Sequence, residues 1–188
     1  MGIEYEVRVL NINHEEMVKK LESLGAEFKF SNLQQRYVYD FNPVVPTKWI
    51  RLRTNGEESA LTIKDVTQKT IDGTKELEVK VDDFAKTHEI LQELGYKHRA
   101  FQENKRTQYI LDGVEIDLDR WPMIPEYMEI EGKSEKDVYD TLEKLGISKE
   151  DVTALDVESV YAQYGYEDIR HIDLSFDKEK EEWKILKN

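Results

Sequence analysis

The chain has 188 residues, enough for one domain with a hydrophobic core and few for two, so we expect a single domain over residues 1–188. Its formal net charge of −13 at pH 7 argues against a general binder of nucleic acids or membrane surfaces, because both partners are polyanions. The absence of cysteine excludes a disulfide framework and thiolate chemistry, and the lack of a long apolar run or a signal-peptide pattern favours the cytoplasm.

The first predicted element is a strand over residues 3–9. Its side chains alternate between two faces: Glu4, Glu6 and Arg8 on the charged face, and Ile3, Tyr5, Val7 and Val9 on the apolar face. Taken alone, this is also the pattern of an ordinary half-buried strand whose charges face water. The later strands are needed to decide between the two interpretations.

The first half of the chain reads as alternating segments separated by turn and cap signals. Asn13 can cap a helix that stops at Gly25, and Asn55-Gly56 is a good hairpin turn between two strands. In order, we expect a helix over 14–24, strands over 26–41, 48–54 and 58–65, and over 65–73 a loop that could act as a lid.

The second half repeats the same kinds of element. In order, we expect a strand over 75–81, a helix over 83–94, strands over 96–110, 114–120 and 126–132, a helix over 134–144 and short helical turns over 148–165. Ser134 with Asp137 resembles a capping box. Residues 173–188 alternate weakly, which is typical of a peripheral strand pair or a partly ordered tail.

Charges are segregated on the polar faces of these strands. Arg51 and Arg53 lie together on one strand, whereas carboxylates lie together on others, as in Glu76-x-Glu78. A solvated surface does not need this segregation, but a site that binds both an anion and a metal ion does. The pattern therefore predicts a barrel with an apolar exterior and a bore lined by charges.

The stretch Glu4-x-Glu6-x-Arg8 resembles the Glu-x-Glu-x-Lys signature of the CYTH superfamily, the triphosphate tunnel metalloenzymes. This superfamily includes class IV adenylyl cyclases, thiamine triphosphatases and bacterial tripolyphosphatases. The resemblance covers residues 2–165, which leaves 166–188 as a peripheral C-terminal extension, and Arg8 replaces the usual lysine. It implies an α+β fold in which helices pack outside an eight-stranded antiparallel closed β-barrel, the triphosphate tunnel.

Two Glu-x-Glu pairs from opposite ends of the chain offer the hard oxygen ligands that Mg²⁺ or Mn²⁺ prefers. They are Glu4, Glu6, Glu129 and Glu131, and the resemblance implies that they bind metal at two sites rather than face water. The resemblance also places Asp119 near the second metal ion and the reactive phosphate. Asp117 shares its face, and one of the two aspartates could instead be a structural partner of an arginine.

The planar guanidinium groups of Arg51 and Arg53 suit phosphate oxygens. By resemblance, Arg8, Lys64 and Arg106 also contact the triphosphate. The family pattern Lys-x-Arg has Asn104 at its first position here, so that positive charge is lost unless the neighbouring Lys105 points inward.

The strand over 75–81 carries three further charges on one face. Glu76 and Glu78 could orient the basic residues or help to hold metal, and Lys80 could contact the triphosphate. A solvated face is the alternative for all three. The four histidines show no metal-ligand spacing, and we assign them no catalytic role.

Together these features predict a metal-dependent hydrolase of inorganic triphosphate or of a nucleoside or other organic triphosphate, with Asp119, Arg8 and Lys64 as catalytic residues. The alternatives are a class IV adenylyl cyclase, which shares the phosphate and metal residues, and a non-catalytic module that binds polyphosphate or nucleotides. We expect a small-molecule triphosphate as the partner, no nucleic acid or membrane, and a monomer or homodimer.

Overall fold

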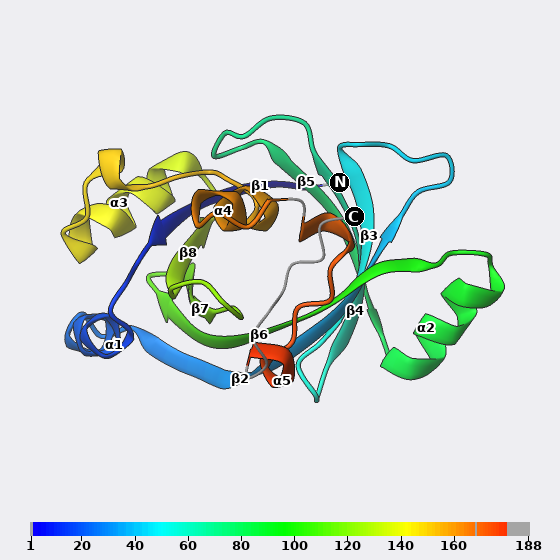
Figure 1. Ribbon diagram of the computed structural model, residues 1–188. Coiled ribbons are helices and arrows are strands. Elements are labelled where there is room, and N and C mark those ends of the chain that lie inside the picture. Colours follow the sequence, from blue (N-terminus) through cyan, green and yellow to red (C-terminus); the bar gives the residue numbers. More distant parts are fainter. Residues whose placement is uncertain (1, 168, 180–188) are drawn as a thin grey trace.

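The computed structural model describes residues 2–167 and 169–179, and these residues form a closed barrel with helices around it (Figure 1). Its strands follow one another in the order β1-β5-β4-β3-β2-β6-β7-β8, and every neighbouring pair is antiparallel. They are β1 (Gly2–Leu10), β2 (Glu27–Asp40), β3 (Lys48–Thr54), β4 (Ser59–Val66), β5 (Thr74–Val81), β6 (His98–Leu111), β7 (Val114–Arg120) and β8 (Tyr127–Gly132). The predicted α+β fold with an eight-stranded antiparallel barrel is confirmed.

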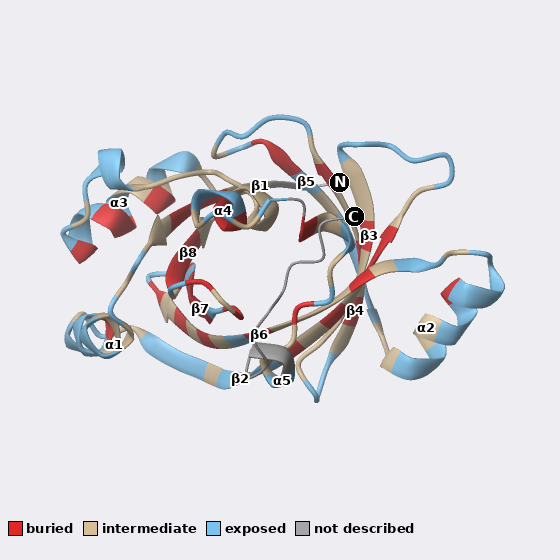
Figure 2. Cartoon of the chain, viewed as in Figure 1, coloured by how far each residue is buried: buried red, intermediate tan, exposed pale blue. Residues whose placement is uncertain are grey.

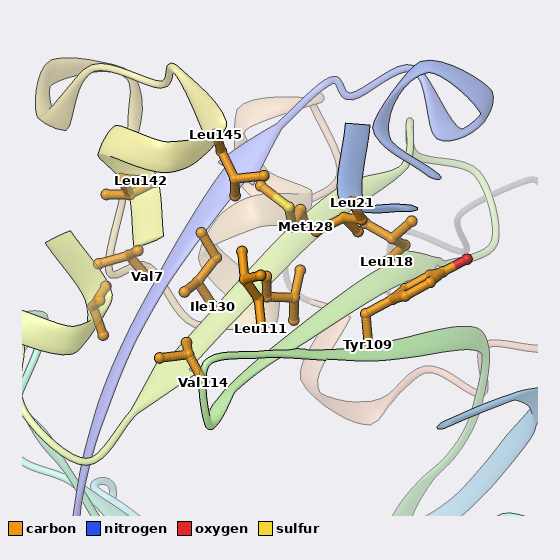
Figure 3. Packing of buried hydrophobic residues seen from close by; sticks show 12 residues of the cluster. Val7, Leu21, Tyr109, Leu111, Val114, Leu118, Met128, Ile130, Leu142 and Leu145 are labelled. Atoms are coloured by element: carbon orange, nitrogen blue, oxygen red, sulfur yellow. The ribbon is translucent and has the colours of Figure 1, made fainter. Parts of the chain in front are cut away.

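Two helices cover one side of the barrel exterior. α1 (His14–Ser23) begins at Asn13, whose side chain accepts from the Glu16 amide, and α3 (Glu135–Leu145) begins at Ser134, which accepts from the Asp137 amide. Their apolar faces and the outward residues of β1, β7 and β8 form a hydrophobic cluster (Figure 3). Fully burying one such aliphatic side chain stabilises the fold by about 1.5–3 kcal/mol. Residues of this cluster include Val7, Leu21, Ile116, Met128, Ile130 and Leu142.

A third helix, α2 (Phe84–Glu93), packs over β2 and β3 at the opposite side (Figure 1). Its Leu91 joins Tyr39, Ile50 and Leu52 in a separate apolar cluster. Figure 2 shows the same division, with buried residues concentrated on strands and exposed residues on the outer faces of helices and on loops. The hydrophobic core therefore lies between the barrel wall and its helices, which leaves the inward face of each strand free for polar residues.

One mouth of the barrel is closed by the segment after α3. α4 (Val157–Gln163) and the short helix η2 (Ile169–His171) pack against Trp121 and Tyr127. Tyr161, Tyr164 and Tyr166 are part of this packing. Trp121 is 1% exposed.

The seam between β1 and β5 is short, because only residues 2–4 of β1 pair with β5. Beyond it, the Glu6 amide donates to the carbonyl of Ile71 at 2.9 Å, and Arg8 and Thr153 exchange two backbone hydrogen bonds of 2.7 and 2.9 Å. The predicted loop after β4 and the segment before α4 thus complete the barrel wall, which satisfies backbone groups that would otherwise be unpaired.

The C-terminal prediction needs correction. Over the described part of 173–188, a strand pair does not form: Leu174 makes a single parallel bridge with Gln102, and α5 (Phe176–Glu179) is a short helix. The Phe176 ring packs under cationic side chains, Lys105 and Arg120, so tertiary contact overrides the weak alternation. Residues 180–188 of the predicted extension lie outside the described residues. The short helix η1 (Lys149–Asp151) is one of the predicted helical turns.

In the described ranges, no helix has both the length and the apolar character needed to span a membrane.

Candidate active site

A cavity of about 720 Å³ occupies the bore of the barrel and is lined by residues from all eight strands. Inward positions alternate with the outward apolar positions described above, as the strand period of two requires. The residues that the sequence predicted for the site and that line this cavity are Glu4, Glu6, Arg8, Arg51, Arg53, Lys64, Glu76, Glu78, Lys80, Arg106, Asp117, Glu129 and Glu131. Of the predicted set, Asp119 alone does not reach the cavity surface.

The lining is divided by charge into two halves. The consecutive strands β4, β3, β2 and β6 contribute cations, which are Lys64, Arg51, Arg53, Arg36, Arg99 and Arg106. The consecutive strands β7, β8, β1 and β5 contribute carboxylates, which are Glu115, Asp117, Glu129, Glu131, Glu4, Glu6, Glu76 and Glu78. Two cations, Arg8 on β1 and Lys80 on β5, lie in the acidic half.

The acidic half contains one compact cluster suited to a metal ion. Carboxylate oxygens of Glu6, Glu129 and Glu131 lie within 4.8 Å of one another. Burial and the neighbouring carboxylates of Glu4, Glu129 and Glu6 raise the pKa of Glu131 to about 8. A divalent cation fits this donor set, because crowded and desolvated carboxylates favour a compensating positive charge.

Glu129 connects this cluster to two arginines. Its Oε2 lies 2.6 Å from Nη2 of Arg8, and its Oε1 lies 3.5 Å from Nη2 of Arg106. Burial acts to raise the pKa of Glu129, but Arg8 and Arg106 outweigh it and lower the pKa to about 2. Arg8 also donates from Nη1 to the carbonyl of Leu155 at 2.5 Å, so its guanidinium links the cluster to the segment that closes one mouth.

Arg106 is held by both aspartates of β7. Its Nη1 lies 2.5 Å from Asp117, and its Nε and Nη2 donate to the two oxygens of Asp119 at 2.8 and 2.6 Å. Asp119 is fully buried and also accepts from Asn104 at 2.8 Å, so it orients cavity residues from behind. Asp117 lines the cavity, and burial raises its pKa to about 7 despite the opposing effect of Arg106.

The other basic residues pair with β5 and β1. Lys64 lies 2.5 Å from Glu76 and 3.3 Å from Glu4, and Arg51 lies 3.1 Å from Glu76. A weaker contact of 3.4 Å joins Arg53 to Glu78. Glu76 and Glu78 therefore line the cavity in ion pairs with these basic residues.

Lys80 differs from these residues, because its side chain is 76% exposed and its ammonium lies 2.8 Å from Glu58. It stands at the rim of the cavity rather than inside. Lys105 does not point inward either, since its ammonium lies over the Phe176 ring at 5.1 Å.

The sequence-based prediction missed Arg36, which lies in the bore on β2. Its position alternates with Tyr37 and Tyr39, whose rings pack toward α2, so the alternation along β2 could have indicated an inward Arg36. Arg36 donates to Asn104, and its guanidinium lies 4.6 Å from the centroid of the Trp121 ring. A positive charge therefore occupies the neighbourhood of Asn104, supplied by the adjacent strand.

A protein-family model described as the CYTH domain matches residues 2–154. No curated protein matches the chain. Among solved structures, a protein from Pyrococcus horikoshii is 26% identical over 83% of this chain and 96% of its own, with a TM-score of 0.69.

Two further solved structures are similar in fold. A candidate adenylate cyclase from Vibrio parahaemolyticus has a TM-score of 0.72 at 14% identity, covering 86% of this chain and 98% of its own. A Hippeastrum protein, described as a candidate adenylyl cyclase with a dominant triphosphatase activity, has a TM-score of 0.59 at 16% identity over 91% of this chain and 100% of its own.

Proposed function

The chain belongs to the CYTH domain family, and from this premise we propose that it is a divalent-metal-dependent hydrolase of inorganic triphosphate or an organic triphosphate. The observation that carries the proposal is the division of the cavity lining into four consecutive cationic strands and four consecutive acidic strands. A chain of phosphates neutralises the first half, and a metal ion neutralises the second.

In this proposal Glu6, Glu129 and Glu131 hold Mg²⁺ or Mn²⁺, and Glu4 lies beside them. Such an ion supplies Lewis-acid polarisation of the phosphoryl group and a lowered pKa for bound water. A second ion would take ligands from the substrate itself, because the described residues contain no second cluster of three acidic or histidine ligands.

The arginines bind and orient the phosphates. Arg51 and Arg53 face the cavity from β3, and Arg106 faces it from β6, on the other side of β2. Each of the three donates to a carboxylate that a phosphate oxygen can replace. Lys64 adds a compact charge at the boundary with the acidic half, next to Glu4 and Glu76.

Two aspartates are given different roles. Asp117 faces the cavity with a pKa near 7, so at neutral pH its carboxyl can take up or release the proton of an attacking water. Asp119 acts through Arg106 and Asn104, whose positions it fixes. Arg8 fixes Glu129 in the metal cluster.

Cyclisation of ATP is the second candidate, and Trp49 favours it. This side chain lines the cavity together with Pro46 and Thr47, and an indole face could stack on a purine. The Hippeastrum relative, with its described triphosphatase activity, favours hydrolysis.

Product analysis distinguishes these functions. The purified protein is incubated with inorganic tripolyphosphate, ATP or thiamine triphosphate under Mg²⁺ and under Mn²⁺, and phosphate, pyrophosphate and cyclic AMP are quantified. We expect phosphate from tripolyphosphate with a kcat/KM above that for ATP, and no cyclic AMP. Cyclic AMP formation in excess of phosphate release would replace the hydrolase with the cyclase, and binding without any product would favour the non-catalytic module.

A further inference from the structure

Arg36 differs in its partners from the other cations that the barrel strands place inside the bore. Arg8, Arg51, Arg53, Lys64 and Arg106 each lie within 4.0 Å of at least one carboxylate. Across residues 2–167 and 169–179, Arg36 makes no such ion pair, although its side chain is only 7% exposed. A buried charge without a counterion is costly for a fold to keep, so its retention suggests a partner from outside the chain.

Neutral groups hold this guanidinium in place. Nη2 donates to Oδ1 of Asn104, the plane lies over the Trp121 ring at 4.6 Å, and Nε has no hydrogen-bond partner. Asn104 is itself fixed by the 2.8 Å hydrogen bond that its amide donates to Asp119. The group is therefore preorganised without a carboxylate in direct contact, and Asp119 is separated from it by Asn104.

Other arginines surround Arg36. It lies directly opposite Arg53 in the β2–β3 register. Burial, followed by the charges of Arg51, Arg106 and Arg53, lowers the pKa of Arg36 to about 9, and the charge of Asp119 only partly opposes this. At neutral pH the side chain remains protonated, so the bore contains a mutually repelling group of four guanidinium ions.

We propose that Arg36 is the principal phosphate ligand of the bore and that Asn104 is its positioning residue. This inference rests on the proposed function. When a phosphate chain enters, Arg51, Arg53 and Arg106 must each exchange a carboxylate for a phosphate oxygen. Arg36 gives up no ion pair, so it gains the whole of the new interaction.

The neutrality of Asn104 is part of this arrangement. Its carbonyl oxygen orients Arg36 without cancelling the charge, as a carboxylate at this position would. Because Asn104 contacts the guanidinium directly, a lysine at position 104 would bring its ammonium into the same region if Arg36 were shortened. A positive charge at this place in the bore should therefore bind the anion, whether β2 or β6 carries it.

Isothermal titration with inorganic tripolyphosphate in metal-free buffer tests the inference without turnover. Arg36→Gln should weaken binding by about ten- to a hundredfold, the range expected for losing a charge-assisted hydrogen bond. The double variant Arg36→Gln/Asn104→Lys should recover affinity. Lys29→Gln is the matched control, because it removes one positive charge from the exposed outer face of the same strand and should leave affinity unchanged.

Thermal melts of the same proteins provide a second readout. Without anion, Arg36→Gln should melt at a higher temperature than wild type, because the variant lacks a buried charge that has no ion pair. Tripolyphosphate should raise the melting temperature of the wild type by more than it raises that of Arg36→Gln. Wild-type protein that does not bind tripolyphosphate would refute the proposed function. Wild-type binding that Arg36→Gln leaves unchanged would overturn this inference alone, and failure of Asn104→Lys to restore affinity would contradict the role given to the charge.

Discussion

Glu131 faces three other carboxylates in the bore, and its pKa is raised to about 8 by burial and by those neighbours. For an acid with a raised pKa, the folded state holds the proton more tightly than the unfolded state. The destabilising effect of Glu131 is therefore absent at low pH, grows above pH 4.5 and is complete above pH 8.

Glu131→Gln should consequently raise the melting temperature of the metal-free protein by several degrees near pH 9 and by little near pH 5. The same variant should lose the stabilisation that Mn²⁺ gives to the wild type, together with metal-dependent turnover. Melting curves at both pH values, with and without Mn²⁺, measure these effects. Normal Mn²⁺ stabilisation and full turnover in the variant would remove Glu131 from the metal site.

Arg51 and Arg53 of β3 give a second prediction about individual residues. Arg51→Ala and Arg53→Ala each remove a charge-assisted phosphate contact, so each should lower kcat/KM by roughly ten- to a hundredfold, and lysine should restore only part of the loss. Lys80→Ala should have a smaller effect, because that ammonium is at the rim and paired with Glu58. Steady-state kinetics on tripolyphosphate measure these changes in kcat/KM. Wild-type kinetics in Arg53→Ala would contradict the conclusion that the charged face of β3 lines the cavity.

At the scale of elements, His88 links α2 to β2. The hydroxyl of Tyr39 lies 2.6 Å from Nδ1 of His88, and the His88 ring stacks on Tyr37 at 3.9 Å. Burial and then the charge of His98 lower the pKa of His88, with Glu89 opposing. Neutral His88 can accept from Tyr39, whereas protonated His88 cannot.

Because the folded pKa of His88 lies below its ordinary 6.5, its contribution to stability is complete above pH 6.5 and is lost as the pH falls below that value. His88→Gln keeps an acceptor oxygen without titrating, so its melting temperature should fall less between pH 7 and pH 5 than that of the wild type. His171→Gln, an exposed histidine on η2, is the control and should retain the wild-type slope. Equal slopes in all three proteins would contradict the role of His88.

The elements also show which parts of the fold local patterns can predict. Asn13, Asn55-Gly56 and Ser134 lie at the helix starts and the hairpin turn that the sequence indicated, because caps and turns depend on neighbouring residues. The closure of the β1–β5 seam by Thr153 could not be predicted, since it joins segments far apart in the chain and neither carries a local signal for the other.

Across the whole molecule, alternation with charge segregation was enough to predict a charged bore, because both follow from the strand period of two. The partners of individual side chains could not be predicted in this way. The contacts of Arg106 with Asp119 and of Arg36 with Asn104 depend on the registers of several strands around the barrel. Asp119 shows this limit of sequence-based prediction. The sequence placed it on the polar face of its strand, but its side chain lies behind Arg106 and does not reach the cavity.

The most direct test of the account is a crystal structure grown with Mn²⁺ and inorganic tripolyphosphate, with an anomalous difference map recorded for manganese. The account predicts an anomalous peak within bonding distance of Glu6, Glu129 and Glu131, and a phosphate chain whose oxygens contact Arg36, Arg51, Arg53 and Arg106. A structure with both ligands at high concentration in which the bore contains only water, or the phosphate chain lies on the outer surface, would contradict it.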